Sequence, residues 1–495
     1  MPAFAFDNSY ARELPDHAVA WKPAAAPAPR LLFFNRPLAD ELGLDAAALA
    51  GEEGAAVFSG SRVPDGAAPI AQAYAGHQFG GFSPQLGDGR ALLLGEVSDR
   101  RGQRRDIALK GSGRTPFSRG GDGKAAVGPM LREVLIGEAM HALGIPTTRA
   151  LAVAATGETV YREAELPGAV LTRVAASHIR VGTFQYFAAR GDLDALRQLG
   201  HYTVARHDPA LVGSPAPWLG LLQAVAERQA LLIAQWVNVG FIHGVMNTDN
   251  MTISGETIDY GPCAFMEAYD PAAVFSSIDH GGRYAYANQP LIARWNLARL
   301  AEALLPLMVG SDEEAEVQAA VAQVTEVIDA FPAGYDAALR RGQRAKLGLQ
   351  QAEADDALLA DDFLALLHQH GVDFTLGWRR LADAAAGDAN PLRALFAEPS
   401  APSAWLARWQ ARLAAEPAGA EARVTAMRRV NPYVIPRNHL VEEALAAATE
   451  PGDLARFEGL LAAVRRPFDE TEDQRPYSQP APAAVTAGYR TFCGT

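Results

Sequence analysis

The sequence predicts an α+β protein in which a small β-rich lobe precedes a large helical lobe. Strand candidates are concentrated between residues 70 and 175, whereas amphipathic helices dominate from about Thr183 onward. Hydrophobic residues make up 49% and charged residues 20% of the chain, proportions typical of a globular protein. A chain of 495 residues is too long for one compact core, so we expect about three domain-sized units.

The overall charge limits the classes of partner. The chain carries 44 basic and 57 acidic residues, a formal charge of −13, which argues against a nucleic-acid partner but allows a local basic pocket. Residues 1–10 have neither a basic start nor an apolar run, and the most apolar helix candidate, 221–241, contains Glu227 and Arg228. We therefore expect a cytoplasmic protein with no signal peptide and no membrane span.

Residues 1–70 are predicted to be an N-terminal extension in which no chemistry is visible. A Pro- and Ala-rich run at 22–30 is expected to be extended and packed on the surface. A short helix is expected at 35–44. The β-rich lobe then spans residues 71–175.

The β-rich lobe is expected to contain a small antiparallel sheet. An Asp-Gly pair within residues 85–90 favours a tight hairpin turn, which leads into an apolar strand at 91–97. A polar turn separates that strand from a second one at 106–110. Two more strand candidates lie at 150–155 and 169–174.

A long loop and a helix interrupt these strands. Lys110 ends the second strand, and residues 111–128 form a loop rich in glycine and charge. Loops of this length inside a domain are usually functional or disordered. Pro129 then opens a helix at 130–143, which Gly-Ile-Pro at 144–146 stops.

The remaining chain is predicted to be helical. We assign 176–330 to the helical lobe and 331–495 to an additional helical region with an irregular tail. The expected helices are 184–189, 193–205, 218–241, 291–305, 313–331 and 357–368. The order of strands, one helix, strands and then helices is typical of two lobes with a nucleotide in the cleft between them.

The stretch at 243–251 concentrates polar groups directly after a predicted helix. It holds adjacent Asp249 and Asn250, and a further carboxylate, Asp259, follows a short apolar run. Carboxylate and amide oxygens are hard ligands that suit Mg²⁺ or Mn²⁺, and phosphates can complete the shell. Each residue alone could cap a turn. The set together predicts a metal site facing a phosphate.

The spacing of this stretch is similar to that of protein kinases, which carry His-Arg-Asp-x-x-x-x-Asn and then Asp-Phe-Gly. His243 and Asn250 have the same separation, and Asp259 opens an Asp-Tyr-Gly variant of the second motif. The position of the kinase base holds Val245, which cannot accept a proton. The chain is therefore either an inactive kinase, or Asp249 acts as base in a different reaction.

Lys110 and Glu133 resemble the kinase pair that holds the α- and β-phosphates. Exposed pairs of this kind are common and contribute only about 0–1 kcal/mol. The pair supports a nucleotide site because it precedes the metal motif in the chain, as it does in kinases.

Two further groups of residues suit a phosphate. The backbone amides of Gly87 and Gly89 could approach one closely, with Arg90 adding charge, although a plain hairpin turn is the alternative because the third kinase glycine is missing. Arg173 and Arg180 carry guanidinium forks that fit phosphate oxygens. Without the other motifs, these arginines would be ordinary surface charges.

Three motifs resemble the selenoprotein O family, also called the YdiU family of protein nucleotidyltransferases. They are AGHQFG at 75–80, LKGSGRTPFSR at 109–119 and HGVMNTDNM at 243–251. The resemblance runs from residues 42–44 to the C-terminal cysteine, which is essentially the whole chain.

The resemblance implies a protein-kinase-like fold that binds ATP in an orientation flipped relative to kinases. It implies transfer of AMP, or of UMP as attributed to bacterial members, to protein hydroxyl groups. It further implies a proton acceptor at Asp249 and Mg²⁺ or Mn²⁺ bound by Asn250 and Asp259. The implied nucleotide contacts are Gly87, Gly89, Arg90, Lys110, Asp122, Gly123, Arg173, Arg180 and Asp259.

The two cysteines, Cys263 and Cys493, are too few for a disulfide framework or a structural zinc site. Cys263 lies where a kinase activation segment would begin, and Cys493 lies near the position where eukaryotic members of the family carry selenocysteine. We therefore hypothesise that the tail folds back and that the two residues form a redox-sensitive disulfide. The alternative is two unrelated thiols.

These observations favour an enzyme that transfers AMP, or UMP from UTP, to Ser, Thr or Tyr hydroxyls of proteins, its own included, and releases pyrophosphate. With a flipped nucleotide, the α-phosphate would face the acceptor and Asp249 would take the proton of the hydroxyl. A conventional protein kinase is the second possibility, against which Val245 and the incomplete glycine loop argue. A catalytically silent, ATP-binding pseudokinase scaffold is the third.

Overall fold

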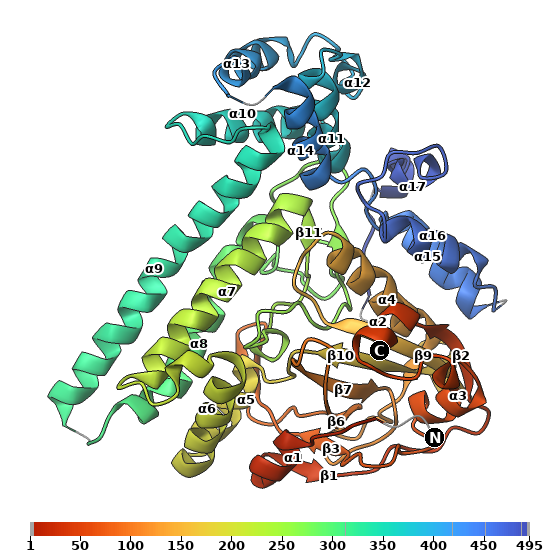
Figure 1. The fold of residues 1–495 in the computed structure, drawn as a ribbon, viewed down its shortest axis with the longest axis vertical. Helices are drawn as coiled ribbons and strands as arrows, with labels where there is room; N and C mark the ends of the chain where they lie inside the picture. Colours follow the sequence, from red (N-terminus) through yellow and green to blue (C-terminus); the bar gives the residue numbers. More distant parts are fainter. Residues whose placement is uncertain (1–3, 312, 418, 451, 487, 493–495) are drawn as a thin grey trace.

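The computed structural model describes residues 4–311, 313–417, 419–450, 452–486 and 488–492. It confirms an α+β protein with an antiparallel sheet (Figure 1). In the described ranges, no helix is long and apolar enough to cross a membrane.

An eight-stranded antiparallel sheet forms the centre of the β-rich part. Its spatial order is β1 (Ala18–Ala20), β3 (Ile70–Gln72), β6 (Ala91–Ser98), β7 (Arg104–Lys110), β10 (Glu165–Ala175), β9 (Arg149–Tyr161) and β2 (Arg30–Phe34), with β8 (Ala125–Ala126) paired to β10. Two small sheets pair β4 (Gly76–Gln78) with β5 (Gly81–Ser83) and β11 (Phe241–Ile242) with β12 (Ala264–Phe265). The N-terminal residues thus supply both outer strands of the main sheet.

The predicted hairpin at 85–90 is wrong. Leu86 and Gly87 donate backbone N–H groups to the carbonyl of Tyr74 at 2.9 and 3.0 Å. The strands on either side, β5 and β6, pair with different partners. The Asp88 carboxylate accepts the N–H of Gln72 at 2.9 Å, so this segment lies along the continuation of β3 instead of turning back on itself.

The helix between the strands, α4 (Val127–Ala142), packs on β9 and β10. Short helices α1 (Ser9–Glu13), α2 (Arg36–Glu41) and α3 (Glu52–Phe58) belong to the N-terminal residues. The helical part begins with α5 (Val181–Ala188), α6 (Leu193–His207), α7 (Pro217–Val239), α8 (Gln289–Met308) and α9 (Glu314–Leu347). It continues with α10 (Asp356–Gln369), α11 (Phe374–Ala385), α12 (Asn390–Arg393), α13 (Ser403–Ala414), α14 (Ala420–Val430), α15 (Asn438–Thr449), α16 (Ala455–Val464), α17 (Arg475–Ser478) and α18 (Ala483–Thr486).

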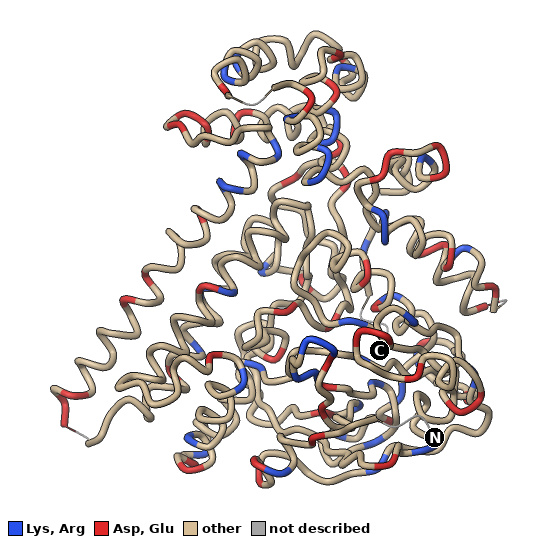
Figure 2. The backbone as a smooth tube through the Cα atoms, in the orientation of Figure 1, with Lys and Arg blue, Asp and Glu red and all other residues tan. Residues whose placement is uncertain are grey.

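Helix α9 is longer than predicted. The predicted end at residue 331 precedes Pro332, yet the helix continues to Leu347 with that proline inside it. A proline inside a helix costs about 3 kcal/mol, and the packing of α9 along α7 and α8 compensates for this cost. Figure 2 shows acidic residues at the start of α9 and basic residues near its end, an arrangement that complements the helix dipole.

The last helices return to the β-rich part. Helices α15 and α16 pack on α4, although about 300 residues separate them in sequence. Their buried side chains share one core with α4, β9 and β10. This return brings α15 to the edge of the cavity described below.

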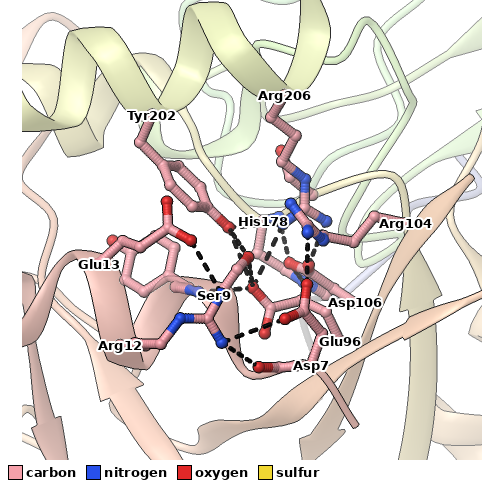
Figure 3. A network of polar contacts seen from close by, with 12 residues as sticks. Asp7, Ser9, Arg12, Glu13, Glu96, Arg104, Asp106, His178, Tyr202 and Arg206 are labelled. Atoms are coloured by element: carbon pink, nitrogen blue, oxygen red, sulfur yellow. Dashed lines mark hydrogen bonds and ion pairs between the residues drawn. The ribbon is translucent and has the colours of Figure 1, made fainter. Parts of the chain in front are cut away.

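A buried polar network joins the N-terminus, the main sheet and α6 (Figure 3). Glu96 and Asp106 lie opposite each other on β6 and β7. Arg206 of α6 lies 2.5 Å from Asp106 Oδ1 and 3.4 Å from Glu96 Oε1, so it serves both carboxylates. Ser9 Oγ donates to Glu96 Oε1 at 2.8 Å, and the ring of His178 lies 2.9 Å from Asp106 Oδ2.

Replacing Arg206 should therefore destabilise the whole fold. Arg206→Met would remove the guanidinium that the two buried carboxylates share, and such a loss costs about 3–5 kcal/mol of unfolding free energy. Arg197→Met is the matched control on the same helix, because Arg197 is exposed and pairs only with exposed Asp194; it should cost no more than about 0.5 kcal/mol. Equal losses for both variants in urea denaturation would contradict this role of Arg206.

Candidate active site

The loop that carries the polar stretch is closed at its base by strand pairing. It leaves β11 and returns to β12, and the two strands pair with each other. Inside the loop, the ring of buried His243 lies 2.9 Å from the carbonyl oxygen of Ile258. His243 thus fastens the segment before Asp249 to the segment before Asp259. Burial lowers the pKa of His243, which suits this structural role.

A cluster of buried charges surrounds Asp259. Its Oδ1 lies 2.7 Å from Lys110 Nζ and 2.7 Å from Arg173 Nη2, and its Oδ2 lies 3.3 Å from Arg180 Nη1. Glu133 of α4 completes the cluster: its Oε2 lies 2.7 Å from Arg173, and its Oε1 accepts a short hydrogen bond from Lys110. Burial acts to raise the pKa of Asp259, but Arg173, Lys110 and Arg180 hold it well below its usual range.

The strand register explains how the sheet contributes to this cluster. Lys110 on β7 lies opposite Leu171 of β10, and Arg173 lies opposite Ala108. Residues two apart on a strand share a face, so Lys110 and Arg173 project from the same side of the sheet. Helix α4 covers that side and brings Glu133 to both.

Asp249 has a different environment, although it lies near the same cations. Arg180 contacts only its backbone carbonyl, at 2.9 Å, and Gln78 Nε2 donates to its Oδ2 at 3.3 Å. The second oxygen, Oδ1, is buried and has no hydrogen-bond partner among the described residues. Burial raises the pKa of Asp249 to about 6. A Cβ at Gly76 would lie 2.6 Å from Oδ1, so this close approach requires glycine.

Asn250 presents its amide oxygen. The side-chain nitrogen donates to the carbonyl of Val245 at 3.0 Å, which leaves Oδ1 as an available acceptor. In the part of the chain that the structure describes, no three His, Cys, Asp or Glu side chains gather into a metal site. The side chains of Asn250 and Asp259 each carry an oxygen of the hard type that Mg²⁺ takes in proteins, and both line the cavity described next.

One cavity of about 1230 Å³ connects all these groups. Its wall includes every predicted nucleotide- and metal-binding residue: Gly87, Gly89, Arg90, Lys110, Asp122, Gly123, Arg173, Arg180, Asn250 and Asp259, together with Glu133 and Asp249. Ten Lys and Arg residues line it against seven Asp and Glu residues. In a chain with a formal charge of −13, this local excess of positive charge favours an anionic ligand.

Two loops form one wall of the cavity. Gly87 adopts φ +68°, and a Cβ there would lie 2.3 Å from the ring of Phe117. Thr115 Oγ1 donates to the carbonyl of Asp88 at 2.6 Å, which joins the loop at 111–128 to the segment at 85–90. Arg90 has no ion pair or side-chain hydrogen bond with the rest of the described chain, so its guanidinium is available to a ligand.

Asp122 lines the cavity, but its carboxylate is already engaged by other residues of the protein. Its carboxylate lies 2.8 Å from Arg162 Nη1 and accepts the N–H of Lys124 at 2.9 Å. Its position in the wall is therefore fixed by Arg162, a residue that sequence reasoning missed. Gly123 follows with φ +68°, and its Cβ would clash with the carbonyl of Gly113 at 2.1 Å.

Other residues of the site gave no recognisable signal in the sequence. Tyr74 stacks on Arg180, whose guanidinium carbon lies 4.6 Å from the ring centre. Gln185 of α5 accepts a hydrogen bond from Thr248 Oγ1 at 2.6 Å and so orients the turn before Asp249. These contacts connect segments far apart in the chain.

The described end of the chain lies against the segment that follows Asp259. Thr491 Oγ1 donates to the carbonyl of Pro262 at 2.7 Å, and Thr491 N donates to the carbonyl of Phe275 at 2.8 Å. Cys263 is buried, and burial raises the pKa of its thiol to about 11. Cys493 lies outside the described residues, so its pairing with Cys263 stays a prediction.

A cationic cavity with a buried carboxylate, a Lys–Glu pair and the side-chain oxygens of Asn250 and Asp259 is typical of nucleotide-dependent transferases. The comparisons with known proteins make this class specific. The family model described as "Protein adenylyltransferase SelO" matches residues 3–465. The chain belongs to this family, which confirms the resemblance seen in the motifs.

Curated relatives over the full chain carry the name "Protein nucleotidyltransferase YdiU". One from Cereibacter sphaeroides is 62% identical over 493 residues, which cover 99% of this chain and 100% of the relative. One from Chromobacterium violaceum is 62% identical and covers 96% of this chain and 99% of its own length. One from Rhizobium etli is 59% identical and covers 100% and 98%, respectively. Membership places the chain among nucleotidyltransferases, whose co-substrate is a nucleoside triphosphate.

The charge of the cavity predicts binding of a bare polyphosphate. Inorganic tripolyphosphate should raise the melting temperature, because a ligand that binds only the folded state stabilises it. Arg90→Gln should weaken the binding by on the order of tenfold, since a hydrogen bond to a charged group contributes about 1.5–3 kcal/mol. The measurement is the melting temperature against tripolyphosphate concentration at constant ionic strength.

Arg100→Gln is the matched control, since it removes the same charge from an exposed turn between β6 and β7. Its titration should follow that of the wild type. A wild-type melting temperature that tripolyphosphate does not change would contradict the cavity as an anion site.

Proposed function

We propose that the protein transfers AMP from ATP to Ser, Thr or Tyr hydroxyls of acceptor proteins, itself included, with UTP as the alternative donor. The observation that carries this proposal is Asp249, a buried carboxylate with a raised pKa and one unbonded oxygen in the cationic cavity. The position of the kinase base holds Val245, which cannot serve. A base with a pKa near the working pH is suited to taking a proton from a hydroxyl.

The proposed architecture is that of a kinase-like, two-lobed protein. The main sheet and α4 correspond to the smaller lobe, and the helices from α5 onward correspond to the larger lobe. The contact between Lys110 and Glu133 supports this assignment, because kinases place such a pair between a strand and the helix that follows. The nucleotide would occupy the cavity between the two.

Asn250 and Asp259 would hold Mg²⁺ or Mn²⁺ together with the phosphates. The metal would supply a Lewis acid that neutralises charge on the leaving pyrophosphate. The fit is supported by the available Asn250 Oδ1 and by an Asp259 carboxylate that stays ionised among three cations. Among the described residues, Asp259 Oδ2 has one hydrogen-bonding partner, Arg180 at 3.3 Å, and so can accept a further one.

The proposed step uses this chain's residues in two places. Asp249 accepts the proton of the acceptor hydroxyl, whose oxygen forms a bond to the α-phosphorus. The bond from the α-phosphorus to the bridging oxygen of the β-phosphate breaks, and pyrophosphate leaves with that oxygen. Arg90 and the backbone of Gly87 and Gly89 would face the β- and γ-phosphates, which is the flipped orientation.

The return of the tail to Pro262 supports the predicted redox control in part. An oxidised Cys263–Cys493 bond would hold the tail against the segment after Asp259. It stays a prediction of the proposed function.

ATP labelled at either the α- or the γ-phosphate tests the proposal. With Mg²⁺ or Mn²⁺, acceptor protein or the enzyme itself should retain label from the α-phosphate only. Asp259→Ala should abolish labelling, because it removes a metal ligand and the partner of three cations. Asp194→Ala, in which an exposed carboxylate of α6 is lost, is the control and should keep full labelling.

Three other results would contradict the proposal in different ways. Label from the γ-phosphate alone would indicate a conventional kinase. Label from neither position would indicate a silent nucleotide-binding scaffold. Unchanged labelling by folded Asp259→Ala would exclude the assigned metal ligand.

A further inference from the structure

We propose that one surface beside the cavity selects acceptor polypeptides that carry Asp or Glu close to the hydroxyl to be modified. This acceptor surface consists of Phe79, Phe82, Arg283, Trp295 and Arg299. The inference rests on the proposed function and adds the chemistry of the acceptor. Four observations lead to it.

The hairpin of β4 and β5 is attached directly to the loop that carries Asp249. His77 N donates to Thr248 Oγ1 at 2.7 Å, and Phe79 N donates to Asn247 Oδ1 at 3.1 Å. Between them, Gln78 donates to Asp249 itself at 3.3 Å. Gln78 and Phe79 also line the cavity, so the acceptor surface continues into the site of the proposed base.

Two phenylalanines of this hairpin are exposed. Phe79 is 40% and Phe82 is 43% accessible to solvent. Phe79 also has φ +52°, in the left-handed region that a bulky side chain rarely adopts. Such backbone strain costs on the order of 1–3 kcal/mol and is concentrated at functional sites. Exposed aromatic side chains at the mouth of a cavity fit an apolar contact with a polypeptide.

Two guanidinium groups crowd one indole ring beside the hairpin. Arg283 and Arg299 lie 4.8 and 4.9 Å from the ring centre of Trp295. Glu302 compensates Arg299 at 2.6 Å. Arg283 has no carboxylate partner within the described ranges: its side chain hydrogen-bonds the hydroxyl of Tyr284, and its Nε is buried without a hydrogen bond.

The acid nearest to Arg283 in the sequence is already engaged. Asp279 accepts the backbone N–H groups of Arg283 and Tyr284 at 2.9 and 2.8 Å, so both of its oxygens are in use. A guanidinium without a carboxylate partner, next to a second guanidinium, is suited to an external carboxylate. An arginine stacked on an aromatic ring is well suited to hold it.

The position of Arg283 relative to Asp249 also limits how far the carboxylate can be from the hydroxyl in the acceptor sequence. A Cβ at Gly80 would lie 3.7 Å from the guanidinium of Arg283, so the cation lies beside the hairpin turn. Gly80 lies in the turn that directly follows Gln78, the residue bonded to Asp249. We therefore place the acceptor's carboxylate within a few residues of the hydroxyl that lies at Asp249.

Peptides with a single serine test this inference on the full-length enzyme. In one peptide the serine is flanked on both sides by Asp at the second to fourth positions, and in the other every Asp is Asn. With α-labelled ATP, kcat/KM for the Asp peptide should exceed that for the Asn peptide about tenfold, a ratio expected for one charged hydrogen bond. Arg283→Gln should reduce this ratio to about one.

Two further variants separate charge from apolar contact. Phe82→Ala should lower kcat/KM for both peptides by the same factor and leave the ratio unchanged. Arg197→Gln, which removes an exposed arginine of α6, should keep the wild-type ratio. A wild-type ratio of one, or a ratio that survives in Arg283→Gln, would overturn the inference.

Fluorescence anisotropy of the labelled peptides distinguishes failure of this inference from failure of the proposed function. Preferential binding of the Asp peptide by the wild type but not by Arg283→Gln, without any labelling, would support the acceptor surface and contradict AMP transfer. Equal binding and equal labelling of both peptides would overturn the acceptor preference and leave AMP transfer standing. Neither binding nor labelling would overturn both.

Discussion

The ion cluster around Asp259 is the interaction on which the rest of the site depends. It joins Lys110 of β7, Arg173 of β10 and Glu133 of α4 to the loop after β11. Buried charges are tolerated only when they are paired, and removing one partner is far more costly than the pair is worth. With Arg180, three cations face two carboxylates. The fold therefore holds a positive charge in its centre that an anionic ligand can share.

Asp249 and Asp259 have pKa shifts of opposite direction. Asp259 contacts the cations directly, and they hold its pKa well below the usual range. It therefore stays ionised, which suits the proposed role as a metal ligand. Asp249 is buried ten residues earlier in the chain and is bonded to Arg180 only through its backbone carbonyl, and burial raises its pKa to about 6. Two acids whose environments push their pKa values apart are the usual sign of separate roles. In the proposed function, Asp249 takes the place of the base that is missing at Val245.

The sequence predicted those parts of the site that depend on local order. The strand ending at Lys110, the helix carrying Glu133 and the spacing of Asp249, Asn250 and Asp259 could be read because each lies within one element or loop. The hairpin expected at 85–90 failed because the tertiary contact of Asp88 with Gln72 overrides the turn preference of Asp-Gly. Helix α9 continues through Pro332 because its packing on α7 and α8 outweighs the low helix propensity of proline. The contact of Gln78 with Asp249 and the return of α15 to α4 link distant segments, and a single sequence carries no signal for such pairs.

The proposed function requires Asp249 to face the α-phosphate of a flipped nucleotide. A crystal structure with a non-hydrolysable ATP analogue and Mn²⁺ measures this directly, because anomalous scattering locates the metal and the phosphorus positions show the orientation. The account predicts Mn²⁺ between Asn250 and Asp259, the α-phosphorus as the phosphorus nearest to Asp249, and the γ-phosphate at Arg90. A γ-phosphorus next to Asp249, with the α-phosphate at Arg90, would contradict it.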